Sequence, residues 1–287
     1  MKKLLVPLIV CLCIGITACG GGAPTQVPSQ PDVSTVVAET VQAMTAAAPA
    51  ATSQPEIQGI PASYENVSFV IPQGLATGTL AGTVNDTELH YIYPDPAFPS
   101  HIKITLQGYN VSSGLQAGIA VLKSNDAIQY NDIYQTAIST LQNLQWTATQ
   151  PIPEAISLGY LGAPQVVNFK NGHGIRYLAQ INQGPAPINN QELFYYFQGI
   201  TNDNAYFVVA VLPLHASFLA TNSSSDPSAV PPDGIPFPGF TNPNASSEDI
   251  QAYYKAISNK LDASAPDVFS PLLAELDALI QSIQINP

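Results

Sequence analysis

The sequence predicts an α+β domain built on a mainly antiparallel sheet with helices packed on it. Segments with strand periodicity occur in pairs joined by short turn sequences, and such hairpins make antiparallel neighbours. Helical spacing of apolar residues occurs once between these pairs, at 131–146, and twice at the end of the chain, at 247–261 and 267–283. Apolar residues make up 46% of the 287 residues, which is enough to bury a substantial core.

Composition excludes several classes of function. The net charge of −12 argues against a nucleic acid partner. All three cysteines lie within the first 19 residues, which argues against a disulfide scaffold, a thiolate metal site and a cysteine enzyme. The serine hydrolase elbow, the zinc protease helix and the phosphate-binding loop all have sequence motifs that do not occur here. We therefore expect no cofactor and no metal, and the sequence favours a non-catalytic protein.

The N-terminus has the features of an export signal. Lys2 and Lys3 precede an apolar stretch at 4–16, which is too short for a bilayer that needs about 20 residues. The sequence Ile16-Thr17-Ala18-Cys19 then resembles the lipobox of bacterial lipoproteins. That resemblance implies cleavage before Cys19, a lipid on the Cys19 sulfur, and a protein held by acyl chains on the extracytoplasmic face of a membrane. The alternative is an ordinary secretory signal cut after Ala18, with Cys19 free.

Three regions follow from these patterns. Residues 1–18 form the signal peptide. Residues 19–60 contain no aromatic residue and are rich in Ala, Thr and Pro, which predicts a flexible tether. Residues 61–287 form a single α+β domain that ends in two helices.

The first half of the domain contains strands and then a helix. We predict strands at 64–71 and 76–84, and a short one at 119–122. Ile102, Ile104 and Leu106 alternate with Lys103, Thr105 and Gln107, which predicts a half-buried strand. Asn131 or Asp132 is expected to cap a helix that ends near Trp146.

The second half contains two hairpins and two helices. Asn171-Gly172 predicts a tight turn with positive φ between strands at 165–170 and 174–181. Asn202-Asp203-Asn204 joins strands at 193–201 and 205–212, and a long loop follows at 221–245. Ser264 and Asp267 form a start signal for the last helix. This order is similar in outline to the α/β/α sandwich of the PsbP and Mog1 type.

The candidate ligand-binding residues are Arg176, Tyr177, Tyr195 and Tyr196. Arg176 is the only arginine and lies in an otherwise apolar strand. It is expected to pair with Glu192 or another carboxylate, although it could also recognise a ligand carboxylate. The tyrosines belong to a dense aromatic run, which favours a central strand covered on both sides. The alternative is an exposed face that stacks on sugar rings or packs on another protein.

Other candidate sites have simpler interpretations. Ser100 and Lys103 match an S-x-x-K pattern, but on a strand residues i and i+3 point to opposite faces. His90, His101, His173 and His215 lack metal-ligand spacing and are interpreted as isolated surface or turn residues. Asp203 with its two asparagines could bind calcium, but turn chemistry explains the same residues.

One resemblance concerns the body of the chain. The stretch NGHGIRYLAQ, followed by INNQELFYYFQGITNDNAYFVVAVLP, resembles an uncharacterised group of secreted bacterial proteins and lipoproteins. The resemblance covers residues 165–215. No activity is attached to that group, so it implies no functional residue.

The sequence thus favours a membrane-anchored lipoprotein whose non-catalytic extracytoplasmic domain binds an unknown protein or polymer ligand. Two alternatives remain. A hydrolase of envelope polymers would show two carboxyl groups converging in a cleft at ~5 to 9 Å. A structural accessory subunit of an envelope complex would show a wide, flat apolar patch.

Overall fold

The computed structural model describes residues 57–85, 99–147, 150–156, 159–182, 184–224, 226–242 and 244–287. A compact unit runs from Glu56 to Pro287. The predicted signal peptide, Cys19 and most of the predicted tether lie outside the described residues. The first strand, β1 (Gly59–Tyr64), already begins two residues before the predicted domain boundary at residue 61.

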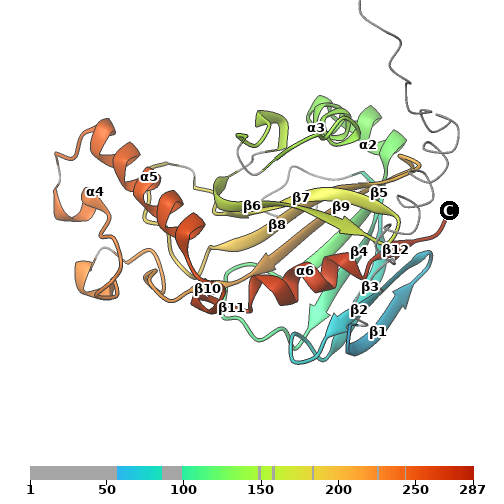
Figure 1. The fold of residues 1–287 in the computed structure, drawn as a ribbon, viewed down its shortest axis with the longest axis horizontal. Coiled ribbons are helices and arrows are strands. Elements are labelled where there is room, and N and C mark those ends of the chain that lie inside the picture. The colour runs from blue at the N-terminus through green and yellow to red at the C-terminus, as the bar shows by residue number, and fades with distance from the viewer. Residues whose placement is uncertain are drawn as a thin grey trace, which may run out of the picture. The chain divides into compact units, whose positions relative to one another are not determined.

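The centre of the unit is an antiparallel sheet (Figure 1). Within the described residues seven strands follow the order β3-β4-β5-β9-β8-β7-β6, and each pair of neighbours is antiparallel. Their bounds are β3 (Gly78–Val84), β4 (His101–Gln107), β5 (Gly118–Lys123), β6 (Tyr160–Phe169), β7 (Gly172–Ala179), β8 (Phe194–Thr201) and β9 (Tyr206–Pro213). This sheet and its helices confirm the predicted α+β class.

Helices cover both faces of the sheet (Figure 1). On one face lie α2 (Ser124–Tyr130) and α3 (Asp132–Gln142), and on the other α5 (Ser247–Ala263) and α6 (Leu273–Gln281). Side chains of β8 alternate between the two cores. Phe194 and Tyr196 belong to the core under α3, whereas Tyr195 and Phe197 belong to the core under α5 and α6. The central strand is therefore covered on both sides, by α5 and α6 on one face and by α3 on the other.

Because helices lie on both faces of the sheet, the predicted burial of β4 also needs a correction. Thr105 was expected on a solvent face, but only 6% of it is exposed. The apolar alternation was predicted correctly, but the opposite face of β4 is partly buried: His101 and Thr105 are buried, whereas Gln107 is exposed. Lys103 lies in this strand, so the S-x-x-K match does not fall on a helix.

The two ends of the compact unit are joined. β1 pairs with β2 (Val67–Pro72), and the short β12 (Gln284–Ile285) adds to the other edge of β2. The Ser282 hydroxyl accepts from Val70 N at 2.9 Å and donates to Val70 O at 3.1 Å. The last residues of the chain therefore hold the first hairpin in place.

The N-terminal strand prediction needs a correction. The segment at 64–71 is not one strand, because a turn at Glu65-Asn66 separates β1 from β2 and Tyr64 pairs with Val67. Glu65 has φ +49°, the left-handed conformation that a tight turn requires. β1 was missed because it is an exposed edge strand with little apolar alternation.

The predicted turn at Asn171-Gly172 is shifted by one residue. Phe169 pairs with Gly172, so the turn residues are Lys170 and Asn171, and neither Asn171 nor Gly172 has positive φ. The Asn171 side chain instead holds β12, because its amide donates to Ile285 O at 2.6 Å and accepts from Ile285 N at 3.1 Å. The glycine serves packing, since a Cβ there would collide with Ile200 O and the Phe169 ring.

The helix predictions were wrong at their ends. The helix expected at 267–283 begins only at Leu273, because Pro266–Val268 forms a 3₁₀ turn, η3, and Phe269–Ser270 forms β11, which pairs with β10 (His215–Ala216). α3 ends at Gln142 and not near Trp146, but Asn131 caps it as predicted and accepts from Ile133 N at 2.8 Å. α2 was not predicted from the sequence.

The long loop at 221–245 contains two short elements in its described part, the 3₁₀ turn η2 (Pro227–Ala229) and α4 (Pro238–Thr241). A further 3₁₀ turn, η1, spans Glu154–Ile156. In the part of the chain that the structure describes, no helix combines the length and the apolar character needed to cross a membrane.

The packing around Gly172 gives a stability prediction. Gly172→Ala should lower the free energy of unfolding by about 1–3 kcal/mol, because the added methyl meets backbone and an aromatic ring that cannot both move away. Gly82→Ala in β3 is the matched control, since a Cβ there has no neighbour within 4 Å. Urea unfolding of both variants checks this, and an equal loss of stability in both would contradict it.

Candidate functional site

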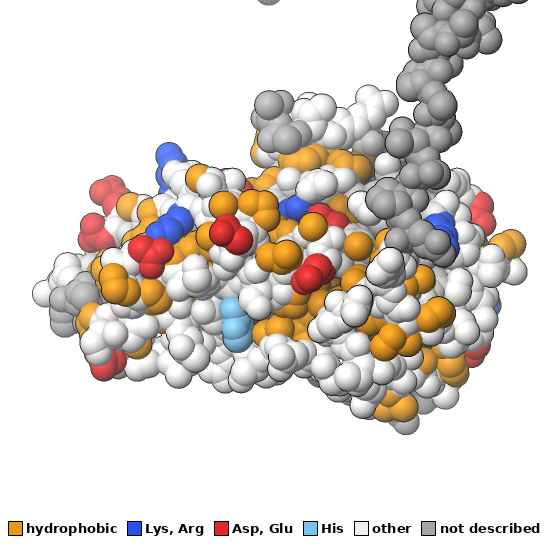
Figure 2. Space-filling model, turned by 60° about the horizontal axis from the view of Figure 1, so that its bottom comes forward, with side chains coloured by type: hydrophobic (Ala, Val, Ile, Leu, Met, Phe, Trp, Pro, Cys, Tyr) orange, Lys and Arg blue, Asp and Glu red, His pale blue; other side chains and the backbone are white. Residues whose placement is uncertain are grey.

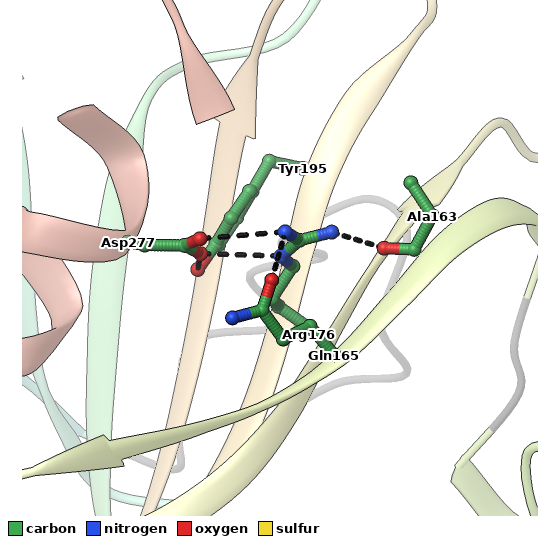
Figure 3. A network of polar contacts seen from close by, with 5 residues as sticks. All are labelled: Ala163, Gln165, Arg176, Tyr195 and Asp277. Atoms are coloured by element: carbon green, nitrogen blue, oxygen red, sulfur yellow. Dashed lines mark hydrogen bonds and ion pairs between the residues drawn. The ribbon is translucent and has the colours of Figure 1, made fainter. Parts of the chain in front are cut away.

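Arg176 lies in a buried polar network that joins β7 to α6 (Figure 3). Its Nε donates to Asp277 Oδ1 at 3.1 Å and its Nη2 to Asp277 Oδ2 at 3.3 Å. The Tyr195 hydroxyl donates to the same Oδ1 at 2.9 Å. On the β6 side, Nη2 donates to Gln165 Oε1 at 2.6 Å and Nη1 to Ala163 O. Arg176 is 6% exposed and Asp277 is 8% exposed, so this is a paired charge in the core.

The expected pairing of Arg176 with a carboxylate is present, but the first partner named for it was wrong. Glu192 accepts instead from Gln180 Nε2 at 3.1 Å and from Asn189 Nδ2 at 2.9 Å. Burial first, and then the Asp277 charge, raise the pKa of Tyr195 well above its ordinary value. Arg176 and Tyr195 thus hold the fold together and face no open surface.

The other two predicted ligand-binding residues are also in the core. Tyr177 and Tyr196 are both 0% exposed, and their ring centroids are 5.4 Å apart in an edge contact. The Tyr196 hydroxyl accepts from Gln198 Nε2 at 2.8 Å. These side chains therefore do not form the exposed stacking face that was the alternative. They form the covered central strands, because helices lie on both faces of the sheet.

The remaining sequence candidates have local roles. His173 Nε2 lies 3.1 Å from Leu141 O, and His215 Nε2 lies 2.9 Å from Ser112 O. The Asp203 carboxylate accepts from Thr201 Oγ1 at 2.5 Å and from Ala205 N at 3.0 Å, and these bonds hold its pKa below the ordinary value. His90 lies outside the described residues. Among those that are described, no three His, Cys, Asp or Glu side chains gather as metal ligands.

An open groove lies where the start of β6 meets α5 and the loop after β7. Its volume is about 820 Å³, within the range of small-molecule sites. The described lining consists of Gly159, Tyr160, Leu161, Gln180, Ile181, Asn182, Gly184, Pro185, Ile188, Ile250, Gln251, Tyr254, Lys255 and Ser258. Lys255 is the single charged side chain in this lining, which we call the α5 groove.

Two tyrosines of α5 fix the loop that forms one wall of the α5 groove. The Tyr254 hydroxyl donates to Ala186 O and accepts from Ala186 N, both at 2.9 Å. The Tyr253 hydroxyl accepts from Ile188 N at 2.9 Å, and burial raises the pKa of Tyr253 to about 12. These three hydrogen bonds hold this wall in a defined position.

The opposite wall begins with Tyr160. Its ring packs edge-on against Tyr177 with the centroids 5.7 Å apart, while 36% of the residue remains exposed. Burial first, and then the negative charge of Asp262, raise the pKa of Tyr160 to about 12. Tyr160 therefore offers an aromatic surface and a neutral hydroxyl to the groove.

Sequence reasoning missed the groove. Gln251, Lys255 and Ser258 follow one another at i, i+4 and i+7 in a helix that was predicted, with buried Tyr253, Ile257 and Leu261 on its inner face. This polar row was visible in the sequence. The sequence did not show which residues lie opposite this row, because Tyr160 and the loop after β7 are distant from α5 in the chain.

A second hollow of about 440 Å³ lies where β3, β4 and β5 come together, and its lining includes Ser100, His101 and Lys123. Of these two hollows, the α5 groove has the larger volume.

Comparison with known proteins adds no assignment: no family profile, no curated protein and no solved structure matches the chain. The lipobox, the resemblance over residues 165–215 and the similarity to PsbP and Mog1 sandwiches therefore stay predictions.

The buried network gives a second prediction. Asp277→Leu should lower the free energy of unfolding by about 3–5 kcal/mol, because it leaves the Arg176 guanidinium buried without its carboxylate. Adding Arg176→Met to the same chain should recover most of that loss, since the unpaired charge is then removed. Urea unfolding of the single and double variants checks this. A double variant no more stable than Asp277→Leu would show that the ion pair is not the source of the cost.

Proposed function

We propose that this chain is a lipid-anchored bacterial protein whose unit at 56–287 binds a ligand outside the membrane, in the α5 groove, without catalysing a reaction on it. The observation that carries the proposal is the groove itself. It is open, it has a volume that suits a small molecule or one segment of a polymer, and its tyrosine-fixed wall is formed before any ligand arrives.

Binding is favoured over hydrolysis by the chemistry of the lining. The described residues of the groove include amide, hydroxyl, aromatic and ammonium groups. None of them is a carboxylate or an imidazole, the side chains that most often act as general acid and base. A glycosidase-type mechanism needs two carboxyl groups at the bond that breaks. The groove therefore supports recognition of a ligand.

The position of the groove suits an anchored protein. Within the 56–287 unit, β1 lies at one end and α5 at the other (Figure 1). The predicted tether leads into β1, and the groove lies at the α5 end of the unit. Figure 2 shows that charged side chains on the face drawn there are sparse, and that both acidic and basic ones lie at the α5 end as well as elsewhere on this face.

The anchor is tested by Cys19→Ala. The wild type should have a mature mass increased by a diacylglycerol group and should partition with membranes, because two acyl chains give stable attachment. The variant should lose both properties. Intact-protein mass spectrometry and membrane fractionation measure them. A wild type that is soluble and without lipid would contradict the anchored state and leave a diffusible secreted protein.

The groove is tested on intact cells with a photoreactive phenylalanine analogue in place of Gln251, which is exposed in the groove. We expect a crosslinked adduct from this position and none from Asn202, an exposed residue of the β8–β9 turn at the other end of the sheet.

Filling the groove with Ser258→Trp should abolish the adduct. Ser139→Trp on α3 is the matched control and should leave it unchanged, since Ser139 is exposed on the opposite face of the sheet. An adduct that forms equally from positions 251 and 202, or that survives Ser258→Trp, would show that the groove is not the binding site.

A further inference from the structure

The row of polar side chains on α5 has no bonding partner among the described residues. Among the described residues no hydrogen bond or ion pair uses the side chains of Gln251, Lys255 or Ser258, although all three line the α5 groove. The Tyr160 hydroxyl across the groove is equally free of a partner in the described part of the chain. By contrast, the Tyr254 hydroxyl and the Gln180 amide in the same lining are fully used. The unengaged groups are therefore available to a ligand.

These groups are mainly hydrogen-bond donors around an aromatic surface. The ammonium of Lys255, the amide of Gln251 and the hydroxyls can each donate to an oxygen. Tyr160 adds a ring on which an apolar face of a ligand can pack. A ligand that matches them carries many oxygen acceptors along one edge and a flat, partly apolar face. A sugar ring has both properties.

The charge of the groove narrows the class of ligand further. The chain has 20 acidic and 8 basic residues, yet the only charged side chain in the described lining is Lys255. Two acids flank this row on α5, Glu248 and Asp262, and neither is part of the described lining; the Asp262 carboxylate also accepts from the amide of Ala163. A ligand with a carboxylate therefore gains an attraction in the groove that the acidic surface elsewhere would not provide.

A peptide added as a strand fits less well. Such a peptide needs a regular free edge, and β6 is the edge strand at the groove. The edge of β6 is interrupted between Tyr160 and Gln165, where Ala163 has φ +52° and Pro164 has no N–H. Ala163 N and O are already bonded to Asp262 and Arg176. Recognition in the groove must then come from side chains.

We propose that the α5 groove binds an acidic oligosaccharide, with a uronic acid carboxylate at Lys255 and a sugar ring against Tyr160. This inference rests on the proposed function of the groove and names its ligand class. Gln251 and Ser258 bond to hydroxyl groups of the same saccharide. No bond is made or broken in the ligand.

The test is calorimetric titration of the full chain in detergent with a panel of short oligosaccharides. The panel contains oligomers of galacturonate, oligomers of mannuronate and guluronate, and oligomers that alternate glucuronate with N-acetylglucosamine. Each is compared with its carboxyl-reduced form. At least one acidic oligomer should bind, and its affinity should be about fivefold higher than that of its reduced form. A difference of about fivefold is the upper range of what one exposed ion pair contributes to affinity. The preference should shrink in about 0.5 M NaCl, because salt screens that attraction.

Variants locate the interaction. Lys255→Ala should remove the preference for the acidic form and leave binding of the reduced form unchanged. Lys170→Ala, which removes the same charge from an exposed turn outside the groove, should leave the preference intact. Tyr160→Ala should weaken both forms about tenfold, the upper range for loss of one aromatic contact. Thermal unfolding of each variant checks that the fold is kept.

Three outcomes would overturn the inference. They are no binding by any member of the panel, equal binding of acidic and reduced forms, and an equal effect of Lys170→Ala and Lys255→Ala. Pentaglutamate is titrated alongside, and tighter binding of this peptide than of the saccharides would also overturn it. In each case an adduct from position 251 that Ser258→Trp abolishes would still support a binding groove, so the ligand class and the proposed function fail separately.

Discussion

Strand β8 presents large apolar side chains to both faces of the central sheet, and the arrangement of the other elements follows from the need to cover them. Phe194, Tyr195, Tyr196 and Phe197 are all 0% exposed. Burying one such side chain contributes about 1.5–3 kcal/mol, so neither face can be left in water. α3 therefore covers one face while α5 and α6 cover the other.

Covering the second face brings a charge into the core. α6 lies against β7 at the position of Arg176, and the charge is tolerated because Asp277, Tyr195 and Gln165 bond to it from neighbouring elements. The same helix leads into β12, which closes the first hairpin. The core network and the closure of the unit thus depend on one C-terminal segment. The α5 groove forms at the edge of the sheet, where α5 extends beyond it (Figure 1).

Much of the fold could be predicted because its signals are local. The alternation in β4, the helical spacing of Tyr134, Ile138 and Leu141, and the Asn131 cap each depend on residues a few positions apart. The errors arose where a distant partner decides the local conformation. Asn171 bonds to Ile285 and not within its own turn, and Phe269 pairs with β10 where helical spacing had predicted a helix. A window of neighbouring residues contains neither partner.

For the candidate site too, some features could be predicted from the sequence and others only from the structure. By itself, the sequence determined the fold class, the likeness of residues 16–19 to a lipobox, and the burial expected for the tyrosine-rich strand. Only the tertiary structure decided that Arg176 pairs with Asp277, 101 residues away, and that Tyr160 lines the same groove as the polar row of α5. The physical reason is that side-chain periodicity sets which face of an element is apolar, whereas the packing of whole elements sets which polar groups meet and which stay free for a ligand.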